Sequence, residues 1–176
     1  MNIKFHFLIT LFLAAAFLNN AAHGEILPAT KAACPNGETV YFSCKTKRSK
    51  LISLCGKEIN KKISSLTYYF GNLDTPELTI SASSKRHFEP FWFNHYFRSG
   101  VDYARINFIR GDYRYEIYSS YNMEETPAVG SGITVSSQSK PDKRTHIECV
   151  KDITINLTPL FQVLNCDEEN ALGCSN

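Results

Sequence analysis

Apolar and polar residues alternate with a period of two through most of the chain, and long helical periodicity is absent. Residues 40–44 and 78–83 show the alternation most clearly. A period of two places successive side chains on opposite faces, as in a half-buried strand of an antiparallel sheet. The pattern predicts about nine strands, which cover residues 40–44, 51–55, 65–70, 78–83, 104–108, 113–117, 133–136, 146–149 and 153–157.

Short turn signals separate these segments. Gly111-Asp112 lies between two alternating runs, where a two-residue hairpin turn is expected. Many short strands with short turns predict an all-β fold, an antiparallel sandwich or a closed barrel. Residues 157–165 allow one short C-terminal helix, with Pro159 in its first turn. Residues 88–97 are rich in aromatic side chains but do not alternate cleanly, so the pattern leaves their conformation open.

The first residues of the chain have the composition of an export signal. Lys4 precedes an apolar run over 5–18, and small residues follow it at 21–24. We expect a signal peptide over residues 1–24, followed by a single β domain over 25–176. A membrane anchor is the alternative, but the apolar run is shorter than the roughly 20 residues that span a bilayer.

The chain contains six cysteines, all of them beyond the predicted signal peptide. An even number in an exported chain predicts disulfides, although sequence alone allows 15 pairings. We favour Cys44–Cys55 across a hairpin and Cys166–Cys174 across an acidic loop, which leaves Cys34–Cys149. Disulfides and a signal peptide together predict a periplasmic or secreted protein.

Composition excludes several classes of function. Loss of Lys4 leaves 18 basic residues against 17 acidic ones, so charge indicates neither nucleic acid nor an anionic membrane as partner. The sequence has no Cys-x-x-Cys pair, no His pair at metal-ligand spacing and no phosphate-binding glycine loop. We therefore expect no metal and no cofactor.

Basic residues concentrate in one region, at Lys45, Lys47, Arg48 and Lys50 and again at Lys57, Lys61 and Lys62. The first four lie at the tip of the hairpin over 40–55, where a rigid positive knob suits an acidic protein cleft or an anionic envelope polymer. The alternative is a solvated hairpin whose lysines prevent association between sheet edges.

Trp92 is the second candidate for binding, because an aromatic side chain among polar ones can stack on a sugar or anchor a protein. The alternative is that this aromatic segment belongs to the core. A hydrolase with an unusual site near His95 and Glu89 is a further alternative, although no nucleophile or acid-base motif accompanies these residues.

The runs Tyr41-Phe42-Ser43-Cys44, Leu51 to Cys55 and Leu66 to Gly71 resemble a family of uncharacterised exported bacterial proteins. The resemblance implies a periplasmic or secreted protein and no assigned activity. In size and architecture the chain is also similar to periplasmic lysozyme inhibitors. We expect a non-enzymatic binding protein that inhibits or neutralises a cell-wall hydrolase or toxin; a structural envelope component is the other alternative.

Overall fold

The computed structural model describes residues 32–140 and 142–175, so the predicted signal peptide lies outside the described residues. The all-β prediction is confirmed, with ten strands and two short 3-10 helices. In chain order they are β1 Thr39–Thr46, β2 Leu51–Ile59, β3 Lys62–Gly71, β4 Pro76–Ser83, η1 Ser84–Arg86, β5 Trp92–Arg98, β6 Val101–Arg110, β7 Tyr113–Asn122, β8 Val129–Ser137, β9 Arg144–Ile155, η2 Thr158–Gln162 and β10 Asn165–Cys166.

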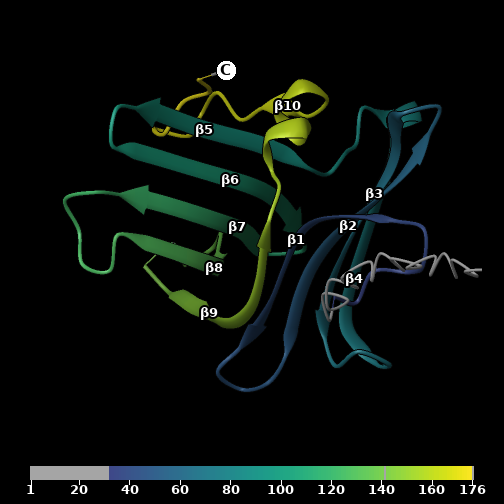
Figure 1. The fold of residues 1–176 in the computed structure, drawn as a ribbon, viewed down its shortest axis with the longest axis horizontal. Coiled ribbons are helices and arrows are strands. Elements are labelled where there is room, and N and C mark those ends of the chain that lie inside the picture. The colour runs from purple at the N-terminus through teal and green to yellow at the C-terminus, as the bar shows by residue number, and fades with distance from the viewer. Residues whose placement is uncertain (1–31, 141, 176) are drawn as a thin grey trace, which may run out of the picture.

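All ten strands belong to one sheet in the order β10-β5-β6-β7-β8-β9-β1-β2-β3-β4, curled into a half-barrel. Figure 1 shows β5–β8 on one side and β1–β4 on the other, with β9 passing between them. The first part of β9 pairs with β8, and from Cys149 onward it pairs with β1 instead. Asp152 has a φ of 52° and the β1–β9 register shifts twice, which marks the bend of this shared strand.

Aromatic side chains from both halves fill the curl of the sheet. The Tyr68 ring from β3 lies 4.9 Å from that of Phe108 on β6, and Phe91 packs edge-on against Phe108 at 5.3 Å. The predicted short helix is present as η2, which buries Leu160 and Phe161 in the same core. The two halves are therefore held together by shared apolar burial as well as by β9.

The aromatic segment forms strand β5, and both faces of its first half are covered, whereas Tyr96 to Arg98 are exposed. Phe93 stacks on Phe161 of η2 at 5.3 Å. Asn94 is fully buried, and its amide donates hydrogen bonds to the carbonyls of Asp167 and Gly173, at 2.8 and 3.2 Å. The C-terminal segment therefore covers this strand, and a buried asparagine interrupts the apolar alternation.

Two of the three predicted disulfides are wrong. The structure pairs Cys34 with Cys55 and Cys44 with Cys149, whereas Cys166–Cys174 is confirmed. In the β1–β2 hairpin Cys44 lies opposite Ile52, three residues from Cys55. An odd offset places the two side chains on opposite faces of the hairpin, about 10 Å apart along the strand, so they cannot be bridged.

Candidate functional site

A pocket of about 550 Å³ opens where the β1–β2 turn faces the first half of β9. Four stretches of the chain contribute to it: the β1–β2 turn, β9, the end of β3 and the start of β4. Its lining residues are Thr46, Lys47, Arg48, Lys50, Phe70, Glu77, Thr145, His146, Ile147, Glu148 and Val150.

Hydrogen bonds within the β1–β2 turn define one wall of the pocket. The amide of Thr46 donates to the Lys50 carbonyl at 2.8 Å, and the amide of Ser49 donates to the Thr46 carbonyl at 2.9 Å. Ser49 has a φ of 60°, which lets the chain reverse over so few residues. Lys47 and Arg48 are left exposed at the tip of this self-contained turn.

Strand β9 forms the opposite wall and is covalently joined to the first. Cys149 of β9 is the register partner of Thr46, and it is bonded to Cys44 two residues earlier in β1. The disulfide and the strand pairing together fix the distance between the turn and β9. The pocket is therefore preformed, which lowers the ordering cost of binding a partner.

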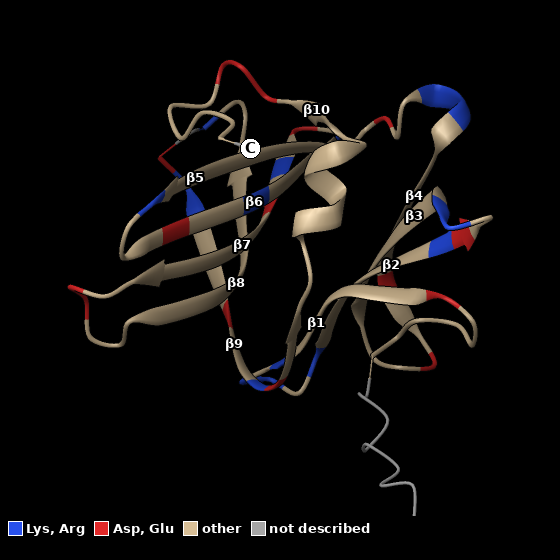
Figure 2. Ribbon diagram, turned by 45° about the horizontal axis from the view of Figure 1, so that its top comes forward, with Lys and Arg blue, Asp and Glu red and all other residues tan. Residues whose placement is uncertain are grey.

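Positive charge dominates the turn side of the pocket. Lys50 is compensated, because its Nζ lies 2.5 Å from Oε1 of Glu77 and donates to Asn72 Oδ1 at 3.0 Å. Lys47 and Arg48 have no carboxylate within 4.0 Å among the described residues. Figure 2 shows basic ribbon segments gathered where β9 meets β1.

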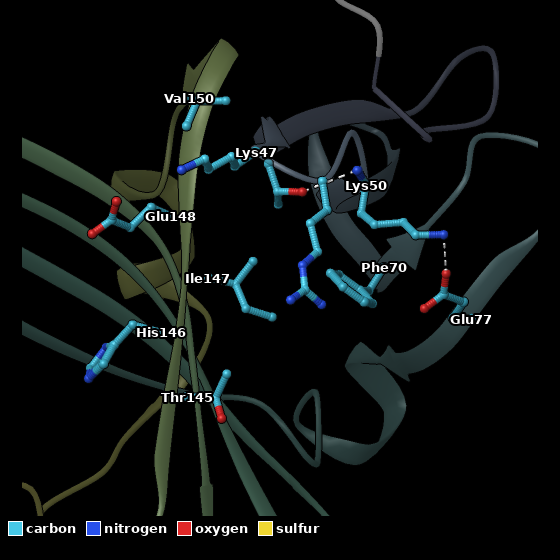
Figure 3. Close-up of a pocket in the computed structure, with 11 residues that line it drawn as sticks. Lys47, Lys50, Phe70, Glu77, Thr145, His146, Ile147, Glu148 and Val150 are labelled. Carbon is cyan, nitrogen blue, oxygen red and sulfur yellow. Dashed lines mark hydrogen bonds and ion pairs between the residues drawn. The ribbon is translucent and has the colours of Figure 1, made fainter.

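Apolar side chains form the inner surface of the same pocket. Ile147 from β9 and Phe70 from β3 are half-buried, and Figure 3 shows them pointing toward each other across the pocket, with a basic side chain drawn between them. Val150 adds a side chain that is 56% exposed, and Lys47 extends toward β9 beside it (Figure 3). An apolar floor beneath two uncompensated cations suits a ligand that is both apolar and anionic.

Three of the five residues predicted for binding meet at this pocket. Lys47, Arg48 and Lys50 line it, whereas Lys45 is half-buried in β1 and does not. Trp92 begins β5, between Asn107 of β6 and Asn165 of β10, and lines neither of the two pockets described.

The second group of lysines does not join the first. Lys57 lies near the far end of β2, and Lys61 and Lys62 lie at and after the β2–β3 turn. Along β2 the nearest members of the two groups, Lys50 and Lys57, are separated by roughly 23 Å at the ordinary strand rise. The basic concentration seen in the sequence is therefore two separate clusters at opposite ends of the hairpin.

Most of the pocket was not predicted from the sequence. Phe70, Glu77 and the β9 residues 145–148 and Val150 are distant in the chain from the basic turn. The pairing of β1 with β9 brings the β9 residues to the turn, and the β2–β3 and β3–β4 pairings bring Phe70 and Glu77 there. No local pattern reports the pairing of β1 with β9. His146 of β9 also lines the pocket, and its Nδ1 lies 3.0 Å from Oγ1 of Thr134 on β8.

His95 and Glu89, the residues of the hydrolase alternative, do not form a common site. His95 Nδ1 lies 2.7 Å from the Ser175 carbonyl and its Nε2 lies 3.1 Å from Asp102 Oδ1, while its ring stacks on Phe161. Both ring nitrogens are therefore within hydrogen-bond distance of groups of the chain itself. Glu89 lines a second pocket, and His95 does not.

Comparison with known proteins assigns this chain to no family. The chain matches no protein-family model, and neither a curated protein nor a solved structure is detectably similar to it.

Within 32–140 and 142–175, no cluster of three or more His, Cys, Asp or Glu side chains is arranged to hold a metal ion. In the same part of the chain, no helix has the length and apolar character to cross a membrane. Three disulfides with no free cysteine there are consistent with an oxidising compartment.

Proposed function

We propose that this protein is a periplasmic or secreted, non-enzymatic binding protein that captures a partner protein, a cell-wall hydrolase or a toxin, through the pocket between the β1–β2 turn and β9. The observation that carries the proposal is the pairing of an apolar floor with two uncompensated cations on a covalently fixed frame. The export signal predicted over residues 1–24 and the disulfides support the compartment.

The residue types support recognition of a protein rather than catalysis. Lys47 and Arg48 are exposed, so they attract an acidic partner before contact and increase the association rate. Phe70 and Ile147 then offer apolar surface that a partner side chain can bury.

Charge reversal within the pocket tests the proposal. The mature chain and its K47E/R48E variant are immobilised and exposed to envelope extract, and captured proteins are identified and assayed for cell-wall hydrolysis or toxicity. The matched control is K57E/K62E, which makes the same change in net charge on exposed residues at the other end of the hairpin. We expect K47E/R48E to lose about tenfold or more in capture and inhibition while the control retains both.

Two results would reject the proposal. One is equal loss in both variants, which would mean that net charge alone is responsible and that the pocket is not the site. The other is capture of envelope polymer without any protein, which would support a structural envelope component instead.

A further inference from the structure

The first half of β9 has a strand neighbour on one side only. Residues 144–148 pair with β8, from Arg144↔Ser136 to Glu148↔Gly132. Pairing with β1 begins only at Cys149↔Thr46, because the β1–β2 hairpin turns back at that level. In the antiparallel ladder, alternate residues of 144–148 direct their N–H and C=O groups away from β8, toward the basic turn.

The pocket follows this unpaired edge. Thr145, His146, Ile147 and Glu148 all line it, although successive residues of a strand point to opposite faces of the sheet. A pocket above one face would be lined by every second residue, whereas one alongside the strand is lined by all of them. The amides of Thr46, Ser49 and Lys50 are hydrogen-bonded within the β1–β2 turn, as shown by Thr46 N–H to Lys50 O at 2.8 Å, so they leave the β9 edge available within the described residues.

Resting on the proposed function, we infer that the partner enters this pocket as an extended acidic segment that adds a strand to the edge of β9 at residues 145–148. The added segment occupies the sheet position next to β9, in line with β1 beyond its end. Its backbone pairs with β9, as in other cases of strand addition to an exposed edge. Its side chains then alternate between the two faces of the sheet.

The chemistry of the pocket specifies the sequence of the segment. Ile147 and Phe70, pointing toward each other in Figure 3, receive an apolar side chain. Lys47 and Arg48, which have no carboxylate within 4.0 Å in the described part of the chain, receive acidic ones. The recognised segment is therefore four to five residues long, about the length of the open edge, and alternates apolar with acidic residues.

Selective backbone methylation tests this mode of binding. The probe is a fluorescein-labelled hexapeptide, acetyl-Glu-Val-Glu-Phe-Glu-Val-amide, titrated against the mature chain by fluorescence anisotropy. Two further peptides carry N-methyl groups at the odd or at the even amides, so that each loses the hydrogen-bond donors of one strand edge. Hydrogen exchange of the β9 amides in the presence of the unmodified peptide gives an independent readout.

Strand addition predicts an asymmetric result. One methylated peptide loses binding by about tenfold or more, because two or three edge hydrogen bonds are lost, and the other binds as the parent does. Alternate amides within 145–148 become protected from exchange, and K47E/R48E weakens binding while K57E/K62E does not.

Equal binding by the two methylated peptides, or no added protection in β9, overturns the inference. So does a failure of the hexapeptide to bind when the mature chain captures its protein partner. These failures leave the proposed function standing. The proposed function fails separately if K47E/R48E captures that partner as well as the unmodified chain does.

Discussion

Removing the Cys44–Cys149 disulfide, in the variant C44A/C149A, should destabilise the protein more than removing either other bridge. This disulfide closes a loop with a sequence separation of 105, against 21 for Cys34–Cys55 and 8 for Cys166–Cys174. In the chain-entropy model those separations correspond to about 5, about 3 and about 2.5 kcal/mol of lost stability. Because domains of this size have only about 5–15 kcal/mol in total, the first loss removes a large part of it.

The single tryptophan makes the measurement direct. Trp92 is the only one in the chain and lies in β5; because its β10 register partner Asn165 precedes Cys166, far-ultraviolet circular dichroism accompanies the fluorescence for C166A/C174A. Urea unfolding followed by Trp92 fluorescence gives the free energy of unfolding for C44A/C149A, C34A/C55A and C166A/C174A. The loss of about 5 kcal/mol in C44A/C149A corresponds to a fall in Tm of roughly 10–20 °C.

The reasoning also predicts a local effect, because this bridge joins the two walls of the pocket. Partner capture should weaken in C44A/C149A under conditions where the variant is still folded, and it should be retained in C166A/C174A. A stability loss in C44A/C149A no larger than that in C166A/C174A would refute the loop-closure argument. Disulfide mapping that finds Cys44 joined to Cys55 would refute the connectivity itself.

Further predictions concern single positions. F70A should weaken partner capture with little change in fold, because Phe70 is half-buried at the pocket; binding and circular dichroism check this, and unchanged binding would remove Phe70 from the site. G132A should lower the free energy of unfolding by about 2 kcal/mol or more, because an added Cβ would lie 2.3 Å from the Ile147 carbonyl oxygen and push β8 away from β9. Thermal unfolding checks this, and an unchanged stability would contradict the close approach. N94A should lower the free energy of unfolding by about 3 kcal/mol, because it leaves the Asn107 amide and the Asp167 and Gly173 carbonyls without their buried partner. An unchanged midpoint of urea unfolding would disprove this. Hydrogen bonds from Ser137 and Ser139 lower the pKa of Asp112. The ionised Asp112 therefore stabilises the folded protein above the ordinary carboxyl pKa, and this stabilisation is lost as the pH falls through the lowered value. D112N should abolish that part of the acid dependence, and an unaltered pH profile of unfolding would contradict it.

The sequence pattern predicted the strands well, for a reason visible in particular elements. In β4 the alternation reflects one covered face, and Gly111-Asp112 forms the predicted two-residue turn between β6 and β7. The conformation of β5 was left open because Asn94 is buried by the C-terminal segment and both faces of the first half of the strand are covered, while Tyr96 to Arg98 are exposed. Local alternation reports one-sided burial, so a strand covered on both faces escapes it.

The disulfides and the pocket depended on information that a local pattern lacks. Cys44 and Cys55 lie close together in the sequence and flank a hairpin turn, yet their register separates them by three residues. The true partner of Cys44 lies on β9, whose pairing with β1 begins at Cys149 and includes the bend at Asp152. The basic turn was predicted as a candidate site from its local charge, and three of its residues line the pocket, whereas the strand that completes the pocket was identified only from the sheet order.

Site-specific photo-crosslinking in cells tests the central claim most directly, since that claim places the partner in the pocket between the β1–β2 turn and β9. A photoreactive phenylalanine analogue is placed at Val150, which is exposed and lines the pocket, or at Ile59, which is equally exposed at the far end of β2. The account predicts a discrete adduct with one protein from position 150, which the acidic hexapeptide prevents, and none from position 59. An adduct from position 59 alone, or equal adducts from both positions that the peptide leaves unchanged, would contradict it.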